Sequence, residues 1–210
     1  MKHESALGQQ SPAIVAILRG IRPDEVVEIG RTLVDAGITI VEVPLNSPDA
    51  LSSIKRLARS IGSNALVGAG TVLTPGAVNE VAASGAKFVV SPNFDPAVIA
   101  RAQKLELEPM PGVMSPTEAM GAVAAGARHL KLFPAASVGS GHIRALLDIL
   151  PGECHLWAVG GVNAGNVPQW SERGAFGVGV GGALYRPGMN ISAVRQKAGE
   201  LVGAWHQNKR

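Results

Sequence analysis

The stretch AGARHLKLFP, residues 125–134, places a glycine at the end of a helical pattern and follows it at once with a short apolar run. The same arrangement recurs in AGITIVEVPL (36–45), SGAKFVVSPN (84–93) and RGAFGVGVGG (173–182). Glycine suits a helix C-terminus because it adopts the left-handed conformation without strain. Each repeat therefore predicts a helix that ends near the glycine and a buried strand that follows it.

Runs rich in Val, Ile and Leu alternate with longer amphipathic segments along the chain, which indicates strands and helices in turn. We predict eight strands, at residues 13–19, 39–45, 65–72, 87–92, 107–112, 129–134, 155–161 and 176–182. Proline beside a capping residue marks helix starts at Pro23-Asp24, Ser47-Pro48-Asp49, Thr74-Pro75, Asp95-Pro96 and Ser115-Pro116-Thr117-Glu118. Eight strand-helix units predict an α/β fold, a single (β/α)8 TIM barrel domain over residues 1–210 with a short N-terminal extension. A doubly wound open sheet is the alternative, but no G-x-G-x-x-G dinucleotide fingerprint opens a helix.

Composition limits the classes of partner. The net charge of +3 comes from 19 basic and 16 acidic residues that are spread along the chain, which argues against nucleic-acid binding. No apolar run reaches the ~20 residues of a membrane helix, so we expect no membrane span. One cysteine, Cys154, excludes an internal disulfide, and residues 1–10 lack the apolar core of a signal peptide. These features predict a cytoplasmic protein.

Lys131 is unexpected in an apolar strand, because lysine is rarely buried without a partner or a task. Five residues after the glycines of the four repeats stand Glu42, Val90, Lys131 and Gly179. In an eight-stranded barrel the inward side chains of alternate strands share a layer, so we expect Glu42 and Lys131 to face each other across the interior. Strand alternation agrees, since the apolar neighbours of both residues would then point outward.

A lysine amine shielded from water can have its pKa lowered to about 7 to 8, which frees it to attack a carbonyl and form a Schiff base. A nearby carboxylate such as Glu42 can move the protons. Arg19 and Thr71 end two further strands and offer a cation and a hydroxyl to a substrate carboxylate. The alternatives are a buried ion pair without chemistry, a solvated Lys131, and a surface role for Arg19.

Glycine pairs end the last two predicted strands, Gly160-Gly161 and Gly181-Gly182. Glycine lets backbone N–H groups approach an anion closely, and the loops after strands seven and eight are the usual phosphate site of this fold. We therefore expect a phosphorylated substrate, with tight turning as the alternative explanation. No cluster with metal-ligand spacing emerges, so no metal is predicted.

Seven motifs carry a resemblance that covers nearly the whole chain. They are AILRG (16–20), VEVPLNSP (41–48), GAGTV (68–72), SPN (91–93), HLKLFP (129–134), AVGGV (158–162) and VGGALYRPG (180–188). Together they resemble the class I aldolases that cleave 2-keto-3-deoxy-6-phospho-sugar acids. VEVPLNSP and AVGGV are more similar to the phosphogalactonate branch, because the phosphogluconate branch usually has threonine and arginine at Pro44 and Asn46. Val159 likewise replaces a typical threonine.

The resemblance implies residue roles. Lys131 would form the Schiff base, Glu42 would act as general acid and base, and Arg19 and Thr71 would bind the pyruvate end. The other substrate-binding positions that we expect are Phe133, Val159, Gly160, Gly161, Gly181 and Gly182. Many relatives carry serine at position 182, so Gly182 lacks one hydroxyl contact to phosphate, which a water could replace.

The resemblance also implies no metal or organic cofactor, a phosphorylated keto-deoxy sugar acid as substrate, pyruvate as product and a homotrimer. Two alternatives remain. A phosphogluconate-specific or dual-specificity enzyme would share all of the chemistry, and a noncatalytic barrel would bind a sugar-acid phosphate without reacting with it.

Overall fold

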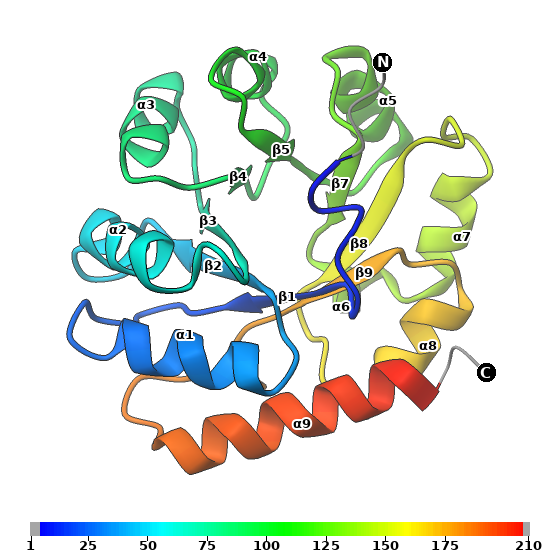
Figure 1. Cartoon of the computed structure of the whole chain (residues 1–210). Coiled ribbons are helices and arrows are strands. Elements are labelled where there is room, and N and C mark those ends of the chain that lie inside the picture. The colour runs from blue at the N-terminus through cyan, green and yellow to red at the C-terminus, as the bar shows by residue number, and fades with distance from the viewer. Residues whose placement is uncertain (1–4, 208–210) are drawn as a thin grey trace.

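The computed structural model describes residues 5–207 and contains a sheet of parallel strands surrounded by helices (Figure 1). The strands are β1 (Ile14–Ile17), β2 (Ile40–Pro44), β3 (Leu66–Gly70), β4 (Phe88–Val90), β5 (Glu108–Met110), β6 (Gly112–Val113), β7 (His129–Leu132), β8 (His155–Val159) and β9 (Gly177–Val180). Their order is β5-β4-β3-β2-β1-β9-β8-β7-β6. Except for β5 and β6, which lie at the two ends of this order, consecutive strands along the chain are neighbours, and β1 pairs with β9.

The prediction of one strand over 107–112 is wrong in detail, because the structure divides it into β5 and β6 at Pro111. Proline has no N–H and cannot donate to a ladder. The two halves still close the barrel. The Met110 carbonyl accepts from the Ser91 N–H (3.2 Å), beside β4, and the Pro111 carbonyl accepts from the Lys131 N–H (2.9 Å), on β7. The eight-stranded barrel prediction is therefore confirmed, with β5 and β6 together occupying one strand position.

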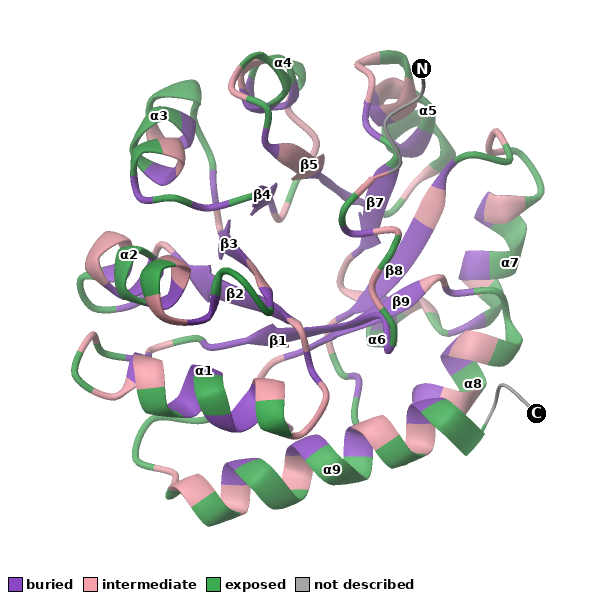
Figure 2. Ribbon diagram, viewed as in Figure 1, coloured by how far each residue is buried: buried purple, intermediate pink, exposed green. Residues whose placement is uncertain are grey.

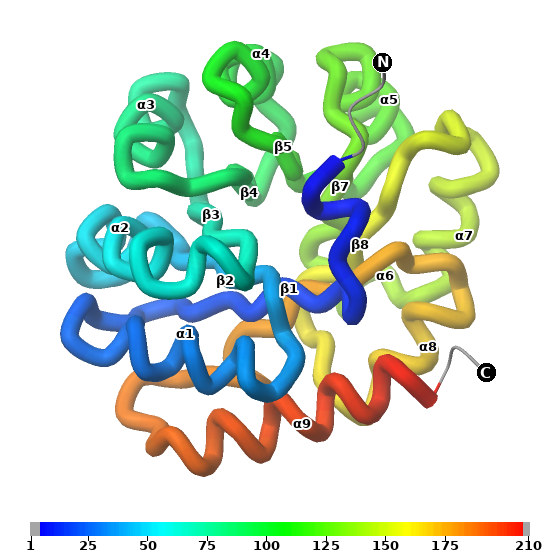
Figure 3. The backbone as a smooth tube through the Cα atoms, viewed as in Figure 1, coloured from blue at the N-terminus to red at the C-terminus, as the bar shows by residue number. Residues whose placement is uncertain are grey.

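Helices form the outer ring (Figure 3). They are α1 (Val26–Asp35), α2 (Ala50–Ile61), α3 (Pro75–Ala83), α4 (Pro96–Lys104), α5 (Pro116–Ala124), α6 (Ala135–Val138), α7 (Gly141–Leu147), α8 (Val167–Glu172) and α9 (Ile191–Gln207). Buried residues line the strands and the inner faces of the helices, and exposed residues cover the outside (Figure 2). Within residues 5–207, no helix has the length and apolar character needed to cross a membrane.

The four glycines of the repeats all adopt positive φ, between 89° and 97°. At the end of α1, the Ile38 N–H donates to the Leu33 carbonyl (2.9 Å) and the Gly37 N–H to the Val34 carbonyl (2.9 Å). These two bonds define a Schellman motif, which satisfies carbonyls that the helix leaves unpaired. Equivalent pairs end α5 and α8. The glycines therefore fix where each helix stops and the next strand starts, which confirms the repeat.

Most helix starts also follow the predicted caps. Thr74 and Asp95 accept hydrogen bonds from the first turns of α3 and α4, and Ser115 forms the predicted capping box of α5 with Glu118. The start predicted at Pro23-Asp24 is too early, because α1 begins at Val26 after a turn and has no side-chain cap. Short-range capping chemistry therefore marks the helix starts only to within a few residues.

Residues 5–12 cover the amino-terminal end of the barrel, where the structure places the described part of the predicted N-terminal extension (Figure 1). The Glu108 carboxylate, at the start of β5, accepts from the N–H groups of Ala6 (2.6 Å) and Leu7 (3.1 Å), and the Leu7 side chain is fully buried. These contacts close the end of the barrel opposite to the carboxyl ends of the strands.

His129 forms the polar part of this floor. The Trp157 indole N–H donates to His129 Nδ1 (2.9 Å), and Nε2 lies 2.6 Å from the Ser5 hydroxyl. Because indole nitrogen is only a donor, the hydrogen of the neutral imidazole is on Nε2, which donates to Ser5. Burial, with a smaller contribution from His155, lowers the pKa of His129 from 6.5 to about 3. His129 is therefore a neutral structural residue on the same inward-facing side of β7 as Lys131.

We expect His129 to make stability depend on pH. In the unfolded chain His129 binds a proton below pH 6.5, whereas in the native state it stays neutral down to about pH 3. The contribution of neutral His129 to the free energy of unfolding is therefore present above pH 6.5 and is lost as the pH falls from 6.5 to about 3. Between pH 7.5 and 5.0 the loss is about 2 kcal/mol. Urea unfolding of His129→Asn should show a weaker pH dependence than wild type, and the exposed His206→Asn control should match wild type. Equal slopes for His129→Asn and wild type would contradict this account.

Candidate active site

A cavity of about 690 Å³ opens at the carboxyl ends of the strands, which is where barrel enzymes carry their sites. Its lining contains two acidic or basic residues from strand interiors and a group of glycines from the loops after β8 and β9. The lining residues are Ile17, Arg19, Glu42, Lys131, Phe133, Val159, Gly160, Gly161, Val162, Asn163, Gly179, Gly181, Gly182, Ala183 and Arg186. The structure therefore brings together every sequence-predicted site residue except Thr71.

Lys131 reaches the cavity from the middle of β7. It pairs in register with Gly112 on one side and Trp157 on the other, and only 6% of the residue is exposed. Its neighbours Leu130 and Leu132 are fully buried, as expected for side chains that pack outward against helices. Lys131 Nζ lies 4.4 Å from the centroid of the Phe133 ring. The alternation that we predicted for this strand is confirmed.

Glu42 lies in β2, in register with Ile17 of β1 and Gly68 of β3, and is 3% exposed. Gly70, two residues further along β3, makes room for it, because a Cβ at this position would overlap the Glu42 carboxylate. A side chain at position 70 would therefore displace the carboxylate. The glycine in GAGTV contributes to the site by its lack of a side chain, a role that the sequence did not reveal.

Burial dominates the electrostatics of both residues. Burial raises the pKa of Glu42, and the positive charges of Lys131 and Arg19 reduce this rise. Burial lowers the pKa of Lys131; the negative charge of Glu42 reduces this fall, and the positive charge of Arg19 adds to it. Among residues 5–207 no salt bridge joins Glu42 to Lys131, although each senses the charge of the other. A lowered lysine pKa increases the fraction of neutral amine, the form that can attack a carbonyl.

Arg19 lies two residues after β1, is exposed and lines the cavity. Its Nη1–H donates to Asn46 Oδ1 (2.9 Å), and the next residue, Gly20, donates its N–H to the Ser47 hydroxyl (2.9 Å). The loop after β2 thus fixes the segment that carries Arg19. The motifs marked Asn46 as a branch-specific residue and Arg19 as a binding residue, but the contact between them was not predictable from the sequence.

Thr71 lies directly after β3, beside Gly70, and is outside the residues that line the cavity. Its φ of 56° is in the left-handed region, which is uncommon for a β-branched residue. Hydrogen bonds on the following residues hold this turn: the Val72 N–H donates to the Val90 carbonyl (3.1 Å), and the Ser91 hydroxyl donates to the Val72 carbonyl (2.7 Å). The backbone is therefore held in a strained conformation beside the site, while the substrate contact of Thr71 stays a prediction.

Backbone conformation and space restrict the two glycine pairs to different degrees. Gly160 and Gly161 have φ of 98° and 79°, so a turn that favours glycine follows β8. A Cβ at Gly161 would also collide with Ala136. Neither restriction holds at Gly182, where a Cβ would meet only the Nε of Arg186, at 3.6 Å. Turn geometry explains the first pair, whereas position 182 has room for a side chain.

Two polar lining residues were missed from the sequence, Asn163 and Arg186. Asn163 lies in the loop after β8, where its N–H donates to Asn166 Oδ1 (2.9 Å) while Asn166 Nδ2 donates to the Gly161 carbonyl (2.9 Å). Arg186 is part of the motif VGGALYRPG, and its charge beside the glycines was the available signal. Among the described residues there is no group of three or more His, Cys, Asp or Glu placed to hold a metal ion.

The fold and the cavity together define a barrel protein whose site combines a buried lysine, a buried carboxylate and a glycine-rich loop region. The chain belongs to the KDPG and KHG aldolase family, whose model matches residues 8–196. It is 43% identical over 192 residues to the "Probable 2-dehydro-3-deoxy-6-phosphogalactonate aldolase" of Rhizobium meliloti (91% of each chain). It is 41% identical to the 2-dehydro-3-deoxy-6-phosphogalactonate aldolase of Escherichia coli, over 92% of this chain and 95% of that protein.

A solved structure described as "Native KDPGal structure" superimposes on this chain with a TM-score of 0.94 and 40% identity. The match covers 96% of this chain and 98% of the other. The family predicted from the sequence motifs is therefore confirmed, and so is the barrel fold.

Proposed function

We propose that this protein cleaves 2-dehydro-3-deoxy-6-phospho-D-galactonate to pyruvate and D-glyceraldehyde 3-phosphate through a Schiff base on Lys131. The observation that carries the proposal is the position of Lys131: its buried amine, with a lowered pKa, faces a cavity that also holds the Glu42 carboxylate. The names of the relatives that are 41% and 43% identical support the choice of substrate.

The reaction begins when the neutral Lys131 amine attacks the C2 ketone, and loss of water gives a protonated imine. Glu42 then takes the proton of the C4 hydroxyl, the C3–C4 bond breaks, and its electron pair enters the imine to give an enamine. Glyceraldehyde 3-phosphate leaves. Protonation of the enamine at C3 restores an imine, and water hydrolyses it to pyruvate and free Lys131. Glu42 acts first as base and then as acid, and its raised pKa is suited to both roles.

The two ends of the substrate, its carboxylate and its phosphate, bind to different residues of the cavity. Arg19, held by Asn46, serves the carboxylate of the pyruvate half, with the Thr71 hydroxyl as a second contact. Phe133 packs beside the imine, close to Lys131 Nζ. Gly160, Gly161, Gly181 and Gly182 bind the phosphate through backbone N–H groups.

Assays with the two substrates that differ only in configuration at C4 test the assignment. We expect the galactonate substrate to have the higher kcat/KM. A higher kcat/KM for the gluconate substrate would support the phosphogluconate alternative, and equal values would identify a dual-specificity enzyme.

Val159 is the residue that we expect to set this preference. It ends β8, is 6% exposed, and its methyl groups face the barrel interior, where a Cβ on Gly179 would meet Val159 Cγ2 at 2.8 Å. Threonine could hydrogen-bond the C4 hydroxyl of one epimer, whereas valine offers only methyl groups. Val159→Thr should therefore shift the kcat/KM ratio toward the gluconate epimer by about one to two factors of ten.

Competition between the purified epimers measures this shift directly. Val162→Thr is the matched control, because Val162 is buried in the lining of the same cavity beyond Gly160-Gly161. An unchanged ratio for Val159→Thr would place the specificity elsewhere, in the loop of residues 44–47. A comparable shift for both variants would show that the position of the hydroxyl is immaterial.

We also propose a homotrimer, as the sequence resemblance implies, and a cytoplasmic location, as the single cysteine and the polar residues 1–10 predict. Large exposed apolar side chains support association: Leu73, in the loop after β3, is 50% exposed, and Met114, directly after β6, and Met120, in α5, are 40% and 45% exposed. Light scattering after size exclusion should give three times the chain mass of 21.6 kDa. A monomer mass would reject the trimer.

A further inference from the structure

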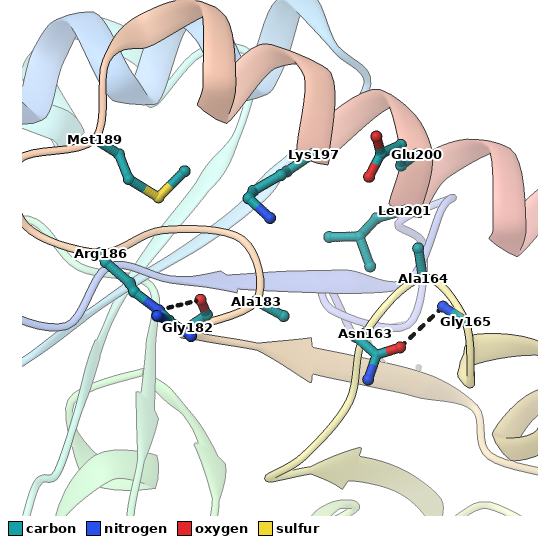
Figure 4. Close-up of a pocket in the computed structure, with 10 residues that line it drawn as sticks. All are labelled: Asn163, Ala164, Gly165, Gly182, Ala183, Arg186, Met189, Lys197, Glu200 and Leu201. Carbon is teal, nitrogen blue, oxygen red and sulfur yellow. Dashed lines mark hydrogen bonds between the residues drawn. The ribbon is translucent and has the colours of Figure 1, made fainter.

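A second cavity, of about 550 Å³, adjoins the substrate cavity (Figure 4). It lies between α9 and the loops that follow β8 and β9, and it shares four lining residues with the substrate cavity. The shared residues are Asn163, Gly182, Ala183 and Arg186, and the others are Ala164, Gly165, Met189, Lys197, Glu200 and Leu201. The wall between the two cavities is therefore the loop that begins with the proposed phosphate-binding glycines.

Arg186 is fixed in this wall. Its Nε–H donates to the Gly182 carbonyl (2.9 Å), which leaves the terminal guanidinium nitrogens available (Figure 4). The preceding residues anchor the loop, because Leu184 is fully buried and Tyr185, 1% exposed, donates its hydroxyl hydrogen to Glu25 Oε1 (3.1 Å). The Leu184 N–H also donates to the Gly181 carbonyl (2.8 Å). The arginine therefore extends from a closed turn and lies beside Gly182.

The charge of Arg186 is not neutralised by a carboxylate. None of the four salt bridges found within residues 5–207 involves Arg186 or Lys197. Lys197 extends from α9 toward the loop that carries Arg186 (Figure 4). Glu200, the one acidic residue in this lining, accepts a hydrogen bond from Gln196 (2.9 Å). This end of the double cavity thus has two cations and one carboxylate, which favours an anion.

We propose that Arg186 binds the substrate phosphate with its terminal guanidinium nitrogens, and that Lys197 adds a second positive charge from the adjoining cavity. The proposal rests on the proposed function, which places a phosphate at these glycines. Position 182 has room for a side chain, and a Cβ there would lie 3.6 Å from Arg186 Nε. The arginine therefore occupies the side of the loop on which a serine hydroxyl would contact the phosphate. A guanidinium binds phosphate by charge-assisted, often bidentate, hydrogen bonds, which offset the missing hydroxyl.

Steady-state kinetics of Arg186→Ala test the proposal. KM for the phosphorylated substrate should rise by about 10- to 100-fold, with a smaller fall in kcat, because the phosphate contact is made in the ground state and in the transition state alike. Arg186→Lys should recover part of the loss. Lys197→Ala should raise KM by less than Arg186→Ala does, and KM should depend less on salt concentration than in wild type. Arg195→Ala is the control, since this exposed arginine of α9 pairs with Asp35 (3.7 Å) away from the cavity.

Two further readouts separate a phosphate contact from loop damage and from failure of the proposed function. Calorimetry with inorganic phosphate should show binding to wild type that Arg186→Ala weakens, and this result does not require turnover. Formation of the pyruvate adduct should be the same in Arg186→Ala and wild type. Three results would overturn the proposal. They are an unchanged KM for Arg186→Ala, no phosphate binding by wild type, and a loss of pyruvate adduct in Arg186→Ala as large as its loss of kcat/KM. Absence of turnover by wild type, with phosphate binding that depends on Arg186, would reject the proposed function alone.

Discussion

Replacing Lys131 with alanine should abolish turnover, because no other described residue in the cavity offers a primary amine to the C2 ketone. Without the imine, the electrons of the C3–C4 bond have no acceptor when that bond breaks. We expect activity at the level of the uncatalysed reaction, measured by coupled detection of pyruvate. The expected loss is larger than for any other substitution in the site.

Two variants control for folding and for loss of a positive charge. Lys131→Met keeps most of the side-chain volume inside the barrel and should be equally inactive while it unfolds at a similar temperature to wild type. Lys87→Ala removes an exposed lysine just before β4, at the opposite end of the barrel, and should keep full activity. Turnover by Lys131→Met within about tenfold of wild type would remove Lys131 from the chemistry.

Glu42→Gln should lower kcat by roughly 10² to 10⁴ fold and leave substrate binding largely intact. Glutamine has the same shape, so it fits beside Gly70, but it cannot accept the C4 hydroxyl proton or return a proton to C3. The substitution should also lower the pKa of Lys131 further, because it removes the negative charge of Glu42 that raises this pKa. The amine should therefore remain neutral to lower pH than in wild type.

Single-turnover and steady-state measurements separate these two effects. Adduct formation with pyruvate in Glu42→Gln should extend to lower pH, while the rate of C3–C4 cleavage falls at every pH. Glu80→Gln, an exposed substitution on α3, is the control and should behave as wild type. A kcat for Glu42→Gln within threefold of wild type would exclude Glu42 as the general acid and base.

The position of the site was predictable because local signals fixed the register. A glycine at the end of each of four helices sets where the next strand begins, and counting from it placed Glu42 and Lys131 at equivalent positions. Both residues line the same cavity in the structure. The period of two along each strand then determined that these two side chains point inward.

The features that were missed depend on contacts between distant segments. Arg186 reaches the cavity because Tyr185 bonds to Glu25, which is 160 positions away in the sequence, and nothing in the local pattern encodes that contact. The floor of the barrel likewise depends on Ser5 meeting His129. The break at Pro111 could have been anticipated, since proline removes a ladder donor, but closure across it depends on both neighbouring strands.

Borohydride reduction in the presence of pyruvate, followed by peptide mass spectrometry, identifies the lysine that forms the Schiff base. We expect one covalent pyruvate-derived adduct per chain, on Lys131, with none in Lys131→Met and an undiminished adduct in Lys87→Ala. No adduct in wild type would favour the noncatalytic phosphate-binding alternative. An adduct on any lysine other than Lys131 would contradict the assignment of the site.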